Sequence, residues 1–110
     1  MKVKENYTKI INMKKTKQMV GSSWFEQQVY ATANDLIRVL GEPEYGREGV
    51  DEKVQFDWEM ETDRGDYFTV YDWKEYRDFS MDEEIYWHIG GVTPEGSRLG
   101  KVELINALKQ

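Results

Sequence analysis

Residues 53–60, KVQFDWEM, alternate polar and apolar side chains without a break. A strict period of two is typical of a β-strand with one buried face and one solvent-exposed face. The segment therefore predicts a strand that directs Val54, Phe56, Trp58 and Met60 into a core.

Two further strands are predicted after this segment. Residues 62–66, TDRGD, have the composition of a turn, in which Gly65 is free to adopt a positive φ. The next strand covers residues 67–73, and a charged stretch leads to a third strand at residues 84–89, which we expect Gly90-Gly91 to end. The three segments predict an antiparallel meander. Its core face would carry the apolar alternating residues, namely Val54, Phe56, Trp58, Met60, Phe68, Val70, Ile85, Trp87 and Ile89.

Helices are predicted on both sides of the meander. Thr32 is a suitable N-cap for a helix at residues 33–40, and Gly41 can take the left-handed position after its last turn. The apolar spacing near the C-terminus predicts a second helix at residues 98–109, with Ser97 as the expected cap. Gly100 in its first turn should weaken this helix by about 1 kcal/mol relative to alanine.

The order of elements predicts an α+β fold with a three- or four-stranded antiparallel meander sheet and two helices packed on one face. The fourth strand would come from residues 24–31, WFEQQVYA, which are aromatic and β-prone. Residues 42–52 are expected to form a loop. Residues 1–20 are expected to form a basic flexible arm, and residues 21–110 a single α+β domain.

Charge is distributed very unevenly along the chain. Residues 1–18 hold six lysines and one glutamate, whereas the whole chain of 110 residues has a net charge of −6, which leaves −11 for residues 19–110. So acidic a domain repels nucleic acid, and we expect no direct nucleic acid binding. The acidic surface either keeps the protein soluble or mimics nucleic acid towards a basic protein partner.

Cysteine is absent, and there is one histidine, His88. The lack of cysteine excludes disulfides, thiolate zinc sites and cysteine nucleophiles, and it fits a cytoplasmic location. No apolar run approaches the roughly 20 residues that span a bilayer. The serines lie in no nucleophile motif, so we expect no enzyme, no cofactor and no metal site, although a carboxylate-dependent enzyme stays open.

The predicted sheet face away from the helices is unusually rich in rings. A solvent-exposed face of rings and hydrogen-bonding groups is typical of a recognition surface. Two alternatives stay open: the rings only stiffen the sheet through cross-strand pairs, or residues 24–31 or a second subunit cover them. The candidate ligand- or partner-binding residues are Tyr67, Tyr71, Trp73, Tyr86, His88 and Asp57.

Four short segments give the chain a family resemblance. They are LGEP at residues 40–43, KVQFDW at 53–58, TVYDWK at 69–74 and WHIGG at 87–91. In order and spacing, residues 21–105 resemble a group of small, largely uncharacterised proteins of tailed bacteriophages and prophages. Where this chain has Arg64-Gly65-Asp66, the related turn is usually a plainer Asp-Gly.

The resemblance implies a phage accessory protein that acts in the cytoplasm of the bacterial host. Small phage proteins without catalytic residues often disarm host defences. We therefore expect a non-enzymatic protein that binds and inhibits an anti-phage defence component, such as a CRISPR or signalling effector. The alternatives are a sponge for a nucleotide signal, which would use the aromatic sheet face, and an uncharacterised carboxylate-dependent enzyme. Sheet edges in so small a domain would also allow a homodimer.

Overall fold

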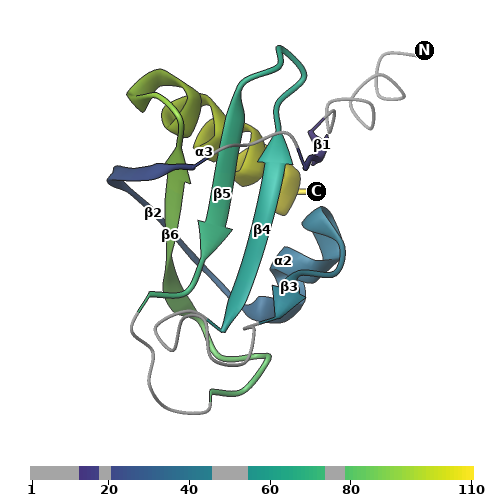
Figure 1. Ribbon diagram of the computed structural model, residues 1–110. Helices are drawn as coiled ribbons and strands as arrows, with labels where there is room; N and C mark the ends of the chain where they lie inside the picture. Colours follow the sequence, from purple (N-terminus) through teal and green to yellow (C-terminus); the bar gives the residue numbers. More distant parts are fainter. Residues whose placement is uncertain (1–12, 18–20, 46–54, 74–78) are drawn as a thin grey trace, which may run out of the picture.

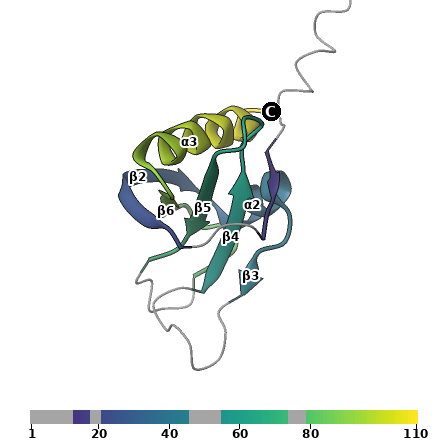
Figure 2. The ribbon, with the colours of Figure 1, turned by 45° about the horizontal axis from the view of Figure 1, so that its top comes forward.

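The computed structural model describes residues 13–17, 21–45, 55–73 and 79–110 (Figure 1). Its six-stranded antiparallel sheet carries two helices on one face, and Figure 2 shows one helix across the top of the strands and the other at their side. The α+β class is therefore confirmed, with more strands than the three or four predicted. The strands are β1 (Lys14–Lys15), β2 (Ser23–Ala31), β3 (Glu44–Tyr45), β4 (Phe56–Glu61), β5 (Tyr67–Tyr71) and β6 (Ile85–Gly91), and the helices are α2 (Ala33–Leu40) and α3 (Pro94–Leu108).

The strand order is β1-β4-β5-β6-β2, and β3 also pairs with β4. The predicted meander corresponds to β4, β5 and β6, and the suspected strand at residues 24–31 is β2, which extends the sheet beyond β6. Strand β4 lies inside the sheet, with β5 on one side and β1 and β3 on the other, and its alternating side chains point to two distinct faces.

The glycines at the end of β6 continue the strand, which corrects the prediction that they end it. Gly90 pairs with Trp24 on one side and Thr69 on the other. A Cβ atom on Gly90 would lie 2.9 Å from the carbonyl oxygen of Ser23. Glycine is therefore present because β2 passes too close to β6 for a side chain.

The two predicted helices are both present, and one begins earlier than expected. Helix α2 has the predicted bounds, and its cap Thr32 accepts a hydrogen bond from the Asp35 N–H at 3.0 Å. Helix α3 begins at Pro94 rather than residue 98, and its cap is Thr93 rather than Ser97. Proline favours the first helical position because its φ is already helical and no N–H is needed there.

Part of the predicted arm joins the sheet. Lys14 and Lys15 form β1 and pair with Glu61 and Met60 of β4. Met13 is buried in the core. Residues 13–17 thus do not form the free arm that was expected, while residues 1–12 and 18–20 lie outside the described residues. Within the predicted loop at 42–52, β3 pairs with β4, and residues 46–52 also lie outside the described part.

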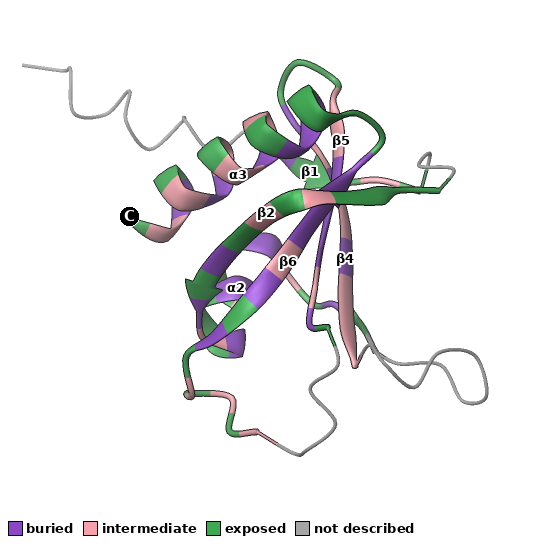
Figure 3. Ribbon diagram, turned by 90° about the vertical axis from the view of Figure 1, so that its left-hand side faces the viewer, coloured by how far each residue is buried: buried purple, intermediate pink, exposed green. Residues whose placement is uncertain are grey.

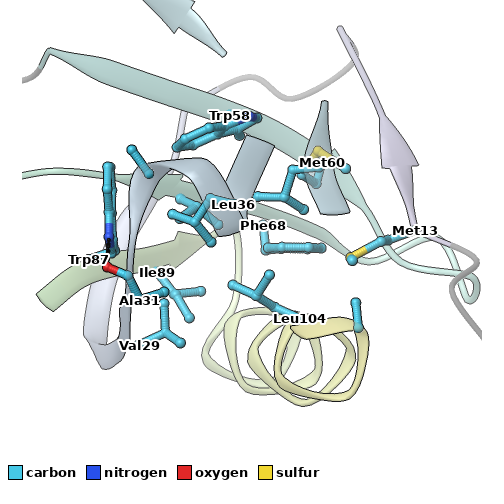
Figure 4. Packing of buried hydrophobic residues seen from close by; sticks show 14 of the residues in the cluster. Met13, Val29, Ala31, Leu36, Trp58, Met60, Phe68, Trp87, Ile89 and Leu104 are labelled. Atoms are coloured by element: carbon cyan, nitrogen blue, oxygen red, sulfur yellow. Dashed lines mark hydrogen bonds between the residues drawn. The ribbon is translucent and has the colours of Figure 1, made fainter. Parts of the chain in front are cut away.

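The core lies between the sheet and the helices, and Figure 3 shows the buried faces of the helices turned towards the strands. The rings of Trp58 and Trp87 meet edge to face at 5.6 Å. Their indole N–H groups donate to the carbonyl oxygens of Gly41 at 2.8 Å and Ala31 at 2.9 Å, so two large side chains are buried without an unpaired donor. Figure 4 shows this packing. The core contains Met13, Val29, Ala31, Ala33, Leu36, Leu40, Trp58, Met60, Phe68, Val70, Ile85, Trp87, Ile89, Leu104 and Ala107.

The predicted core face is confirmed for the described residues with two qualifications. Phe56 is only partly buried and packs against the core from its margin. Val54 lies outside the described residues. In the described part of the chain, neither helix is both long and apolar enough to cross a membrane.

Candidate binding site on the aromatic face of the sheet

Strand register brings several of the predicted site residues together on the sheet face opposite the helices. Asp57 on β4 pairs with Tyr71 on β5, which pairs with His88 on β6. Residues paired across antiparallel strands direct their side chains to the same face. A carboxylate, a phenol and an imidazole therefore form one row across the sheet.

His88 lies at the centre of a ring cluster, which we define as Trp24, Tyr71, Trp73 and His88. Its imidazole stacks on Trp24 at 4.2 Å between centroids with an interplanar angle of 12°. It also stacks on Trp73 at 6.0 Å and 24°, and Tyr71 meets it at 5.5 Å and 66°. Because β2 and β5 border β6 on opposite sides, the two indoles approach the imidazole from opposite sides.

The two tryptophans remain accessible although their inner faces are covered. Trp24 is 43% exposed and Trp73 is 37% exposed, whereas Tyr71 and His88 are half-buried. Ring pairs of this kind stabilise the folded state by about 0.5–1.5 kcal/mol in addition to the contribution of the area that they bury. The ring cluster thus presents two indoles that are already held in place, which lowers the entropy cost of binding a partner.

The electrostatics of the cluster combine neutral rings with neighbouring carboxylates. Burial lowers the pKa of His88 below its ordinary value of 6.5, so the imidazole is neutral at pH 7. Burial and the charge of Asp57 raise the pKa of Tyr71, which keeps the phenol protonated. Asp57 accepts a hydrogen bond from the Thr69 hydroxyl at 2.8 Å, and Glu59 follows it on the same face of β4.

A bulge in β2 places Trp24 in the cluster. Trp24 pairs with Gly90 and Gln27 pairs with Ile89, so Phe25 and Glu26 are two extra residues on β2. A bulge bends the strand and redirects its side chains. The Trp24 indole N–H spans the bulge and donates to the Gln27 carbonyl oxygen at 2.9 Å.

Asp72 holds the segment that carries Trp73. Its side chain is fully buried, and one carboxylate oxygen accepts hydrogen bonds from the Gln55 N–H at 2.8 Å and the Phe56 N–H at 2.7 Å. These two bonds join the end of β5 to the start of β4. Trp73, the next residue, is therefore attached to a fixed point rather than to a free loop.

Two of the predicted site residues lie apart from the ring cluster. Tyr86 is 62% exposed and packs against Tyr30 of β2 at 4.6 Å, as a separate pair towards the other end of β6. Tyr67 pairs with Glu61 at the start of β5, about 13 Å along the strand from Tyr71. Both residues share the sheet face of the ring cluster, as predicted, because they lie an even number of positions from Tyr71 and His88, but they make no part of the cluster itself.

Trp24 and Asp72 are the residues that the sequence interpretation missed as parts of the site. Residues 24–31 were predicted as a candidate strand. The neighbouring sequence does not indicate which strand pairs with it, nor the bulge that directs Trp24 to His88. Asp72 follows Tyr71 as a polar residue in a charged region, and nothing nearby in sequence indicates its burial.

The described residues include no group of three histidine or acidic side chains arranged to hold a metal ion. The chemistry that the ring cluster offers is stacking, hydrophobic contact and, through Asp57 and Glu59, attraction of positive charge. No protein-family model matches the chain, and no curated protein or solved structure is significantly similar to it.

Proposed function

We propose that this chain is a non-enzymatic, phage-encoded accessory protein that binds and inhibits a component of the host's anti-phage defence, such as a CRISPR or signalling effector, in the bacterial cytoplasm. The observation that carries the binding role is the pair of part-exposed indoles, Trp24 and Trp73, held on either side of His88. Rigid, accessible tryptophans are typical anchors of protein interfaces. The phage context rests on the resemblance of the segments around residues 40–43, 53–58, 69–74 and 87–91.

The spacing of the rings favours a protein partner over a base held between two rings. A base inserted between parallel rings needs a separation of about 7 Å, twice the van der Waals contact distance. The centroid distances from His88 are 4.2 Å to Trp24 and 6.0 Å to Trp73, so the rings already fill the space between them. The carboxylates of Asp57 and Glu59 would also repel a phosphate group.

A second candidate function is the nucleotide-signal sponge. The exposed outer faces of Trp24 and Trp73 favour it, because a base can stack on a single indole. A sponge would retain a small molecule on purification, whereas an inhibitor would retain a protein.

A phage challenge of bacteria tests the proposal directly. Strains that each carry one defined defence system would express the chain, and plaque counts would be compared with and without it. We expect the wild type to restore plaques against one system, and Trp24→Ala and Trp73→Ala to lose this activity. Tyr86→Ala is the matched control, since it removes an exposed ring outside the cluster.

Native mass spectrometry of the chain recovered from the same cells identifies what is bound. A host protein in the wild-type complex that is absent from both tryptophan variants supports inhibition by binding. A retained nucleotide supports the sponge. Circular dichroism and thermal unfolding of each variant establish that it is folded, and unchanged plaque counts with folded tryptophan variants contradict a role for the ring cluster.

A further inference from the structure

Glu26 has a backbone conformation that residues other than glycine rarely adopt. Its φ is +67°, and among the described residues it is the only non-glycine with a positive φ. Glycine would occupy this position in the β2 bulge without strain. The Glu26 side chain is exposed, so its burial in the core does not explain the unusual backbone conformation. A strained residue with an exposed charged side chain indicates a role for that side chain in recognition.

Trp24 lies two residues before Glu26 at the same bulge, and both side chains are exposed. Its inner face stacks on His88, and its indole N–H is bonded to Gln27, so the ring is fixed. The opposite face of the ring points away from the His88 imidazole, and β2 is the last strand on this side of the described sheet. Two residues of backbone span at most about 7 Å, which keeps the Glu26 carboxylate within reach of a group on that face.

A planar cation matches an indole face next to a carboxylate. The arginine guanidinium stacks on tryptophan and also donates two parallel hydrogen bonds to a carboxylate. The lysine ammonium is a compact, strongly hydrated charge that does neither as well. The charge of the chain, −11 over residues 19–110, attracts a basic partner in general, and Glu26 and Trp24 would add preference for arginine.

We infer that Trp24 and Glu26 form a recognition site for an arginine side chain on a basic segment of the protein partner. The guanidinium lies on the outer face of Trp24 and pairs with the Glu26 carboxylate. This inference rests on the proposed function, because it names the chemistry by which the partner is recognised.

Titration of the full chain with two peptides of equal charge tests the inference. The probes are acetylated, amidated tetra-arginine and tetra-lysine, and the readout is the NMR signals of the indole N–H groups, assigned with single tryptophan variants. We expect tetra-arginine to bind about three- to fivefold more tightly than tetra-lysine, as one exposed cation–π contact provides. The Trp24 indole signal should shift the most.

Four variants separate stacking and pairing from general acidity. Trp24→Leu and Glu26→Gln should each bring the two peptides to equal affinity. Glu26→Gly should also remove the preference while raising the midpoint of thermal unfolding, because it relieves the backbone strain. Glu84→Gln removes an exposed carboxylate near the other end of β6 and should leave the preference unchanged.

Equal affinities in the wild type, a preference that survives Glu26→Gln, or a largest shift at Trp73 would each overturn the inference. If the arginine preference is absent while the host complex still depends on Trp24 and Trp73, the inference fails and the proposed function stands. If the preference is present but no host complex forms and no plaques are restored, the proposed function fails instead.

Discussion

The ring of Phe68 lies directly against Gly100, where a Cβ atom would come within 2.3 Å of the Phe68 Cγ. Phe68 is fully buried on β5, and Gly100 is in the second turn of α3. The absence of a side chain at Gly100 lets the helix approach the sheet at this point. The glycine that weakens the helix by propensity is therefore required by the packing beneath it.

Gly100→Ala is expected to destabilise the protein, although alanine is the better helix former. The new methyl group meets the buried Phe68 ring, and such overpacking costs about 1–3 kcal/mol. Urea unfolding measures the change. Asn106→Ala, at an exposed position of the same helix, should instead stabilise by up to about 0.7 kcal/mol. A stabilising effect of Gly100→Ala would contradict the close helix–sheet contact.

Thr93→Ala should lower the free energy of unfolding by about 1 kcal/mol, as the loss of an N-cap usually does. The Thr93 hydroxyl oxygen accepts a hydrogen bond from the Gly96 N–H at 3.0 Å, and the side chain is otherwise exposed. Thr93→Ser keeps the oxygen and should restore most of the stability. If Thr93→Ala leaves the unfolding curve unchanged, α3 does not begin at Pro94.

His88 should make the protein less stable as the pH falls below 6.5. Burial among the rings lowers the pKa of His88 in the folded state, so the unfolded chain takes up the proton first. The free energy of unfolding therefore does not depend on His88 titration above pH 6.5. It decreases as the pH falls from 6.5 through the folded pKa. Urea unfolding between about pH 7.5 and pH 5.5, the range in which an ordinary histidine titrates, measures this loss of stability.

His88→Gln is the control for this pH dependence, because it removes the titrating group while keeping a polar side chain. Its stability should change less than that of the wild type over the same pH range. Since His88 is the only histidine, its imidazole NMR signals also report the folded pKa directly. A measured pKa at or above 6.5 would contradict burial of the ring between Trp24 and Trp73.

Glu103→Gln should stabilise the protein at pH 7. Burial, followed by the charges of Asp63 and Asp66, raises the pKa of Glu103 above its ordinary value of 4.5, although a hydrogen bond from the Asp63 backbone acts in the opposite direction. The carboxylate is thus less favourable in the folded than in the unfolded chain at neutral pH. Glutamine can accept the same backbone bond without the charge.

The gain from Glu103→Gln should fade as the pH falls through the raised folded pKa towards 4.5, and it should vanish below 4.5, where the wild-type carboxyl group is protonated in both states. Paired thermal unfolding curves at pH 7 and near pH 4.5 check this. Glu95→Gln, on the exposed side of the same helix, should show no comparable gain. A loss of stability in Glu103→Gln at pH 7 would contradict the repulsion.

Local patterns predicted most of the fold. The alternation in β4, β5 and β6 gave both faces of the sheet, and the cap at Thr32 gave the start of α2. They also predicted that Asp57, Tyr71 and His88 share one face of the sheet, because side-chain direction in a strand follows from sequence position. These features depend on residues within a few positions of one another.

The site was completed by contacts between segments far apart in sequence. Trp24 reaches His88 only because a bulge interrupts the pairing of β2 and β6, and Tyr86 is diverted to Tyr30 by the same pairing. Neither outcome has a local signal, since strand register depends on which strands become neighbours.

The sequence by itself determined the positions of β2, β4, β5, β6 and α2 and which side chains of the central strands face the core, because hydrophobic periodicity and capping act locally. Only the tertiary structure decided that glycines at positions 90 and 100 are contact points and that two indoles stack on one histidine. The reason is that close packing fixes the space available to each side chain, and that space is set by elements that are distant in the chain.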